Sequence, residues 1–235
     1  MLVNNIDIST LNIKLLTVDI QNREITNNCR WNAKAINPTF AENELGFKNI
    51  KLTLLCKGNN RQGILDNISK LVNEFTRNKE NTVVLDGYYN NYICSISKSQ
   101  TNKTKSKTRY TVDLELIGYE EKKNETFLKI SDTDNHTINN NGTSITPCYL
   151  EIAPTYSYDS LTITGLSDDP IKINNVSANK KIIIDGYTNK ITEDEINKFN
   201  DVELFEFPRL NVGSNTVKMS DSRATLTVKW KERFI

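Results

Sequence analysis

The chain has 235 residues, and its 30 lysines and arginines balance 29 aspartates and glutamates to a net charge of +1. This balance excludes an overall field that would draw the chain to nucleic acid or anionic lipid. No apolar run approaches the roughly 18 to 20 residues that cross a bilayer, and the first residues lack the basic stretch and apolar block of a secretory signal. We therefore expect no membrane partner, no secretory signal and no specific nucleic-acid partner.

The first half of the chain predicts a β-rich domain. Alternating or compact apolar runs of this kind are typical of strands with one or both faces buried. The predicted strands are 3–8, 13–20, 23–41, 50–55, 82–86, 92–98 and 110–119. In the longest of them, Cys29 and Trp31 recur on one face with two alanines.

One long helix is predicted, over 61–79. Its apolar residues fall on a single stripe at helical spacing. They are Ile64, Leu65, Ile68, Leu71, Val72 and Phe75. Asn60 has a side chain suited to cap the first turn. A stripe of this kind packs on a core far more often than it recruits a partner helix, so we expect the helix to cover the strands.

A polar and charged segment separates this half from the rest of the chain. Residues 120–137 hold only a brief apolar island, Phe127 to Ile130. We place a linker at 125–137, between an N-terminal domain at 1–124 and a C-terminal domain at 138–235. Two domains suit this length, because single cores seldom grow far beyond it.

The C-terminal domain is predicted to be almost wholly β. Short strands recur at intervals of roughly ten residues, which is typical of a β-sandwich. They are 148–152, 161–164, 171–174, 181–185, 204–207, 215–219 and 224–234. Thr192-Glu193-Asp194-Glu195 has the pattern of a capping box, which predicts a short helix through Phe199. The expected fold class is mainly β with one long helix, and the N-terminal domain is α+β.

A run of basic residues without acidic neighbours lies at 98–109. Its candidate interface residues are Lys98, Lys103, Lys105, Lys107 and Arg109. The last four alternate with serine or threonine, so their charges share one side of an extended segment. The run is either a solvated hairpin or lysine-protected edge strand, or an arm that reaches an acidic surface of another protein subunit. DNA is disfavoured as a partner, because no aromatic residues are interleaved for base stacking.

No metal, cofactor or catalytic group is expected. The four cysteines, Cys29, Cys56, Cys94 and Cys148, are scattered without a CxxC pair, which favours free and mostly buried thiols. His136 is the only histidine and lies in the predicted linker. Neither a zinc site nor a histidine-based catalytic set can then be assembled within one chain, so we expect no enzyme.

Two further groups of residues have both a functional and a structural interpretation. The acids at 168–169 and 193–195 could form a calcium site or a catalytic pair, but their context is that of a turn and a helix start. Five aromatic residues could line a sugar site, although packing in a core or interface explains such residues more often. They are Tyr149, Tyr156, Tyr158, Tyr187 and Trp230.

The order of these features along the whole chain resembles the distal tail proteins, Dit, of long-tailed phages with flexible tails. In the N-terminal half, the resemblance lies in a strand before Lys57-Gly58, the helix at 61–79, and the segments VVLDGYYNNYICSIS and TRYTVDLELIGYEE. In the C-terminal half, it lies in NNNGTSITPCYLEI, in the IIIDG turn, and in FPRLNVGSNTV before the closing strand.

The resemblance implies a structural protein of the virion tail tip, assembled in the host cytoplasm. It implies a galectin-like C-terminal β-sandwich and an N-terminal domain that forms a homo-oligomeric ring, a hexamer. Such a ring joins the tail-tube protein to the tail-associated fibre or lysin protein, and receptor-binding proteins attach to its periphery. Because some relatives carry an inserted carbohydrate-binding domain, a chain of this length is expected to be the minimal hub.

Three other functions stay open at this point. The sandwich could be a carbohydrate-binding adhesion module that holds host sugars with its tyrosine and tryptophan side chains. An enzyme such as a tail hydrolase is disfavoured by the missing catalytic constellation. A different tube or adaptor component of the same class of virion would share the β-rich pattern.

Overall fold

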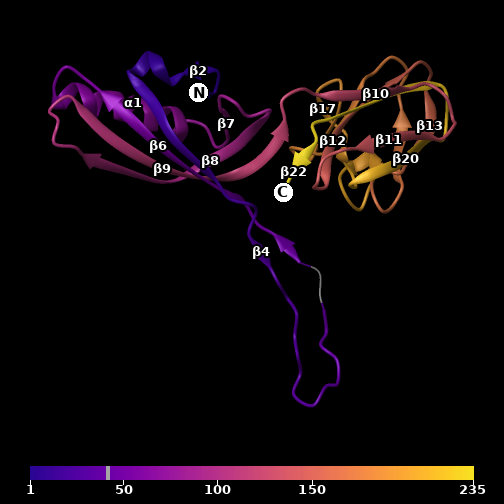
Figure 1. Cartoon of the computed structure of the whole chain (residues 1–235). Coiled ribbons are helices and arrows are strands. Elements are labelled where there is room, and N and C mark those ends of the chain that lie inside the picture. Colours follow the sequence, from indigo (N-terminus) through magenta and orange to yellow (C-terminus); the bar gives the residue numbers. More distant parts are fainter. Residues whose placement is uncertain (41–42) are drawn as a thin grey trace. The chain divides into compact units, whose positions relative to one another are not determined.

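The computed structural model describes residues 1–40 and 43–235, and Figure 1 shows the chain as a cartoon. The chain divides into two compact units. The first consists of Met1–Glu121 with Ile235, and the second of Lys122–Phe234. Each unit buries its own cluster of apolar side chains. Among the described residues, no helix is long and apolar enough to cross a membrane.

The N-terminal unit is built on one sheet. Its strands run in the order β2-β1-β7-β8-β9-β6-β3. Their bounds are β1 Leu2–Val3, β2 Ile6–Asp7, β3 Ile13–Ile20, β6 Lys48–Lys57, β7 Asn81–Val84, β8 Asn90–Lys103 and β9 Arg109–Lys122. In β6 and β9 every second residue is buried, as a period of two predicts for a sheet with one covered face. The 3-10 turn η1 (Ile8–Leu11) lies before β3.

Helix α1 (Arg61–Thr76) covers that face of the sheet. The Asn60 side chain accepts a hydrogen bond from the N–H of Gly63 at 2.8 Å, which confirms the predicted cap. The helix buries Ile64, Ile68, Leu71 and Phe75. It ends at Thr76 and not at Lys79, because Phe75 is the last residue of the apolar stripe and the residues beyond it are charged or polar.

The expected fold class is wrong as stated. The protein is mainly β, but α1 has 16 residues and is a covering element on a β unit, not a long helix that makes the N-terminal domain α+β. The remaining helical structure in the described residues consists of two short 3-10 turns. The sequence pattern overstated the helix because charged residues at the end of the stripe do not oppose a helix locally.

Residues 21–47, here called the arm, connect β3 to β6. The described residues 23–40 do not form the strand predicted at 23–41, and Ala41 lies outside the described residues. In the described part of the arm, pairing is limited to β4 (Ile25–Thr26) with β5 (Glu44–Leu45) and a bridge between Arg30 and Thr39. Figure 1 shows a long loop that leaves the sheet after β3 and returns at β6. The alternating apolar residues have no sheet beside them, so the period of two does not produce a strand here.

The C-terminal unit is a pair of sheets that share one core. One sheet runs β10-β21-β12-β15-β16-β17, with β19 beside β12, and the other runs β11-β20-β13-β14-β18. The bounds are β10 Thr126–Ile130, β11 His136–Asn140, β12 Thr146–Pro154, β13 Tyr158–Thr164, β14 Ile171–Val176, β15 Ile182–Asp185, β16 Lys190–Glu193, β17 Ile196–Asn197, β18 Val202–Glu203, β19 Arg209–Leu210, β20 Gly213–Met219, β21 Ala224–Trp230 and β22 Arg233–Phe234. Buried side chains from both sheets form a single cluster.

Two local predictions in this half are wrong. Residues 125–137 are not a free linker, because β10 pairs with β21 and buries Ile130. The capping box does not start a helix: β16 and β17 flank a turn in which Asp194 and Glu195 have φ of 45° and 68°. Ile191 is buried and pairs with Ile184 across the sheet, so tertiary packing overrides the local capping pattern. Only the 3-10 turn η2 (Phe199–Asp201) follows it before β18.

A substitution at Gly165 should strongly destabilise the C-terminal unit. Gly165 has φ +87°, and a Cβ there would lie 1.8 Å from the carbonyl oxygen of Thr216. Gly213 has the same φ but nothing within 4 Å of its Cβ position, so it isolates the backbone term from the clash. We expect Gly165→Ala to cost about 3 kcal/mol or more, and Gly213→Ala about 1 to 2 kcal/mol, in urea unfolding. Equal costs would contradict the close packing of β13 on β20.

Candidate protein-binding surfaces

The basic run at 98–109 spans the end of β8, the turn after it and the first residue of β9, and the turn is the tip of a hairpin. Its turn is fixed by side-chain hydroxyls. Ser106 N–H donates to Thr104 Oγ1 at 3.2 Å, Thr108 N–H donates to Ser106 Oγ at 3.1 Å, and Thr104 Oγ1 donates to the Arg109 carbonyl oxygen. These hydrogen bonds make the tip an ordered turn. The Ser and Thr hydroxyls face the backbone, and the basic side chains between them are exposed.

The structure divides the five predicted interface residues. Lys103, Lys105, Lys107 and Arg109 are exposed at or beside the tip. Lys98 lies further along β8, where its Nζ is 3.8 Å from Glu115 Oε1. An exposed pair at this distance contributes little to stability. The tip residues thus form one basic surface, and Lys98 belongs to a charge pair outside it.

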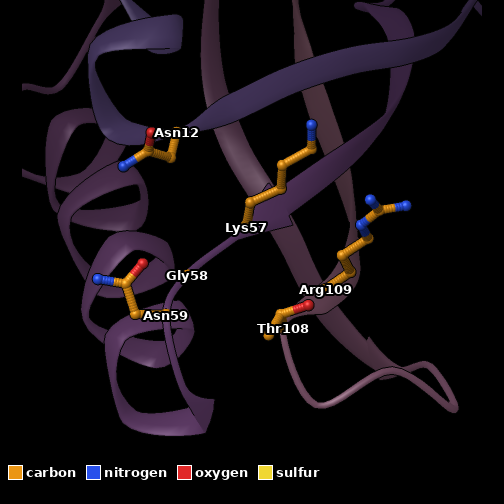
Figure 2. Close-up of a pocket in the computed structure, with 6 residues that line it drawn as sticks. All are labelled: Asn12, Lys57, Gly58, Asn59, Thr108 and Arg109. Atoms are coloured by element: carbon orange, nitrogen blue, oxygen red, sulfur yellow. The ribbon is translucent and has the colours of Figure 1, made fainter.

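A pocket beside this tip is lined in part by Lys57, which is not among the interface residues predicted from the sequence. It is lined by Asn12, Lys57, Gly58, Asn59, Thr108 and Arg109, which Figure 2 shows as sticks. Lys57 ends β6 and is the direct cross-strand partner of Arg109 at the start of β9. The turn signal at 57–60 was visible in the sequence, but the pairing of two distant strands was not.

The arm carries the most exposed large apolar side chains of the N-terminal unit apart from Tyr89. They are Ile25, Trp31, Ile36, Phe40 and Phe47, with exposed fractions of 62, 69, 92, 79 and 57%. None of the described residues of the arm is buried. Trp31 is held locally, since its Nε1–H donates to the Ala35 carbonyl oxygen at 3.1 Å. The arm therefore presents apolar groups that the chain itself does not cover.

Neither His136 nor the two acidic clusters builds a chemical site. His136 begins β11 and its Nε2 lies 2.6 Å from Asp132 Oδ1, a hydrogen bond that lowers the pKa of the Asp132 carboxyl. Asp168 pairs with Arg209 at 3.1 Å, and Asp194 lies in the turn between β16 and β17. Within the described ranges, no group of three or more His, Cys, Asp or Glu residues could hold a metal ion.

The five aromatic residues considered for a sugar site do not form an open platform. Trp230 is only 5% exposed and belongs to the core. Cationic side chains lie over three tyrosine rings: Lys229 over Tyr149, Arg223 over Tyr158 and Arg233 over Tyr187. Tyr156 is 65% exposed. The packing interpretation of these residues fits their contacts better than the sugar-binding one.

The prediction of free and mostly buried thiols is confirmed, and it gives a probe for the arm. Cys29 is exposed on the arm, whereas Cys56, Cys94 and Cys148 are buried. Burial raises the pKa of Cys56 to about 11 and of Cys94 to about 12, and it also raises the pKa of Cys148.

We therefore expect a thiol reagent at mildly alkaline pH to modify one of the four cysteines rapidly in dilute native protein. All four should react after unfolding, and Cys29→Ser should remove the rapid phase. A second rapidly reacting thiol in the native protein would contradict the burial of Cys56, Cys94 and Cys148.

Comparison with known proteins finds similarity to phage tail components. Residues 141–234 match the family model described as siphovirus-type tail component, C-terminal domain. The crystal structure of the Dit protein of phage SPP1, titled a paradigm of hub adsorption apparatus in phages infecting Gram-positive bacteria, is similar over 99% of this chain and 98% of that chain, with a TM-score of 0.78 and 10% identity. No curated protein matches the sequence.

A second solved structure extends the likeness. The baseplate of phage P2 in its activated conformation with calcium matches 97% of this chain and 94% of that chain, with a TM-score of 0.55 and 13% identity. The resemblance to the distal tail proteins is thus confirmed. The galectin-like description of the C-terminal sandwich is not confirmed, because these matches name phage tail and baseplate proteins and no galectin.

Proposed function

We propose that this chain, whose C-terminal unit is a siphovirus-type tail component domain, is a distal tail protein that acts as a structural hub at the tail tip. Six copies form a ring between the tail-tube protein and the tail-associated fibre or lysin protein, and receptor-binding proteins attach to its periphery. The ring assembles in the host cytoplasm and performs no chemical step. The family match and the likeness of the whole fold to a phage hub protein support this role.

The observation that carries the proposal is the uncovered apolar surface of the arm. At roughly 200 Å² per aromatic side chain, Trp31, Phe40 and Phe47 together leave on the order of 400 Å² exposed, and Ile25 and Ile36 add to it. The largest apolar patch of a typical monomer is itself about 300 to 600 Å² and is often functional. Each partner in a standard interface contributes about 800 Å². The three aromatic side chains of the arm therefore supply about half of one partner's share of such an interface.

The local structure of the arm supports the same conclusion. A two-stranded ribbon without a packed face is marginally stable in water, and β4 and β5 contribute two residues each. The base of the arm is anchored, because Arg23 Nε–H donates to the Gly46 carbonyl oxygen at 2.9 Å. The arm is thus fixed at its base, and its exposed apolar side chains are available to pack against another subunit.

The N-terminal sheet ends in two unlike edges that suit a ring. Strand β3 is the last strand on one side and β2 on the other. Strand β3 has a bulge between Leu15 and Thr17, and Leu16 is 48% exposed there. Contacts between unlike surfaces generate closed rings when the rotation closes, and strand edges can pair between subunits. We assign ring and tube contacts to the N-terminal unit and peripheral attachment to the C-terminal unit.

Electron microscopy of the purified chain tests this proposal. Rings with a central opening and a uniform number of subunits are the expected result. Uniform particles of the size of one chain at high protein concentration, or open filaments in place of rings, would contradict it.

A further inference from the structure

The end of the N-terminal sheet holds two like charges directly opposite each other. Lys57 and Arg109 are cross-strand partners in the β6–β9 ladder, and both side chains are exposed. Like charges at opposed positions destabilise a strand pair. Across the described part of the chain, no carboxylate forms an ion pair with either of them.

Three other lysines of the same sheet have acidic neighbours. Lys48 Nζ forms an ion pair with Glu120 Oε2, and Lys98 lies beside Glu115. Lys51 is opposite Asp19 on one side and Glu115 on the other. Lys57 and Arg109 differ from these three lysines, because each of the two faces a cation across the β6–β9 ladder.

The surroundings of the pair form a small site with hydrogen-bonding groups and no acid. Asn12, Asn59 and Thr108 line the pocket with Gly58 (Figure 2). The backbone is fixed on both sides, because Lys57 N–H donates to the Asn12 carbonyl oxygen at 3.0 Å and Gly58 N–H donates to the Thr108 carbonyl oxygen at 3.1 Å. No side chain larger than glycine fits at 58, since a Cβ would lie 2.7 Å from the Ile64 nitrogen.

The charge of the rest of the chain indicates what such a site would meet. Residues 98–109 carry five positive charges and no negative one, and the whole chain carries +1, so the remainder carries −4. The ordered tip extends the positive surface from Arg109 through Lys107, Lys105 and Lys103. A polypeptide segment rich in Asp and Glu is complementary to it.

We propose that Lys57 and Arg109, with the pocket beside them, bind the carboxylates of an acidic polypeptide segment. A guanidinium presents a planar fork that matches a carboxylate, and an ammonium adds a compact charge beside it. The lining of the pocket offers no aromatic face for a nucleobase. Binding would also relieve the repulsion between the two cations.

Fluorescence anisotropy with a labelled decaglutamate peptide tests the site on the full chain. The peptide should bind the native chain more tightly as salt is lowered. Lys57→Gln combined with Arg109→Gln should weaken binding about tenfold. Lys180→Gln combined with Lys190→Gln removes the same charge from exposed positions of the C-terminal unit and should leave binding nearly unchanged.

The thermal unfolding midpoint of the Lys57/Arg109 double variant shows whether weaker binding comes from a loss of folding. Removal of the repulsion should leave this midpoint unchanged or slightly raised. Equal weakening by both double variants would show unspecific charge attraction and overturn the site. Tighter binding of a labelled single-stranded DNA decamer than of decaglutamate would overturn the assignment to carboxylates. Neither result depends on whether the chain forms rings.

Discussion

Replacement of Trp31 and Phe40 by serine should abolish self-association while both units stay folded. These side chains are 69% and 79% exposed and support no core within the chain. An aromatic residue that is buried at a subunit contact contributes on the order of 2 kcal/mol, which is about 30-fold in affinity for each side chain. Each subunit of a closed ring makes two such contacts, so the loss is felt twice per subunit.

Analytical ultracentrifugation over a concentration series measures this effect, with circular dichroism as the check on folding. Tyr89→Ser combined with Phe205→Ser is the matched control, because these side chains are 95% and 86% exposed and lie outside the arm. The control should associate like the native chain. Unchanged association of the Trp31/Phe40 variant would remove the arm from the subunit contact.

Loss of the Lys48 side-chain charge should cause the largest fall in stability of the N-terminal unit. Lys48 and Glu120 are an ion pair with side chains only 5% and 15% exposed. Asn90 Nδ2 donates to the other carboxylate oxygen at 2.8 Å. Lys48→Met leaves a largely buried carboxylate without its cation, and breaking a buried pair in this way costs about 3 to 5 kcal/mol.

The double variant Lys48→Met with Glu120→Met separates the pair from the packing. Because it removes both charges, its free energy of unfolding should return to within about 1 kcal/mol of the native value. Urea unfolding followed by a signal from the N-terminal unit gives both values. If the single and double variants were equally unstable, the cost would lie in the shape of the Lys48 side chain and not in the uncompensated charge.

The elements that could be predicted are those whose structure follows from residues within one continuous segment of the chain. The stripe from Ile64 to Phe75 gave the helix and the Asn60 cap, and the alternation after Ala224 gave β21. A strand was predicted where the arm lies, because the alternation at Cys29 and Trp31 does not show whether a neighbouring strand exists. The helix predicted at 192–199 does not form, because Ile191 pairs with Ile184 of β15 and this long-range pairing leaves no trace in the local pattern.

The binding surfaces were predictable only in part, for the same reason. The basic residues from Lys103 to Arg109 are contiguous in the sequence, so their common exposure could be expected. Lys57 joins Arg109 only through the register of β6 and β9, which no local pattern contains. The side-chain hydroxyls that order the tip were visible as an alternation, but their inward hydrogen bonds depend on the hairpin being closed.

The mass of the purified chain in solution, measured by light scattering over a range of concentrations, tests most directly whether this protein works as a ring. One chain has a mass of 26.8 kDa. The account predicts a species of about six times that mass, which dissociates when Trp31 and Phe40 are replaced. A mass of 26.8 kDa at every concentration would contradict the account.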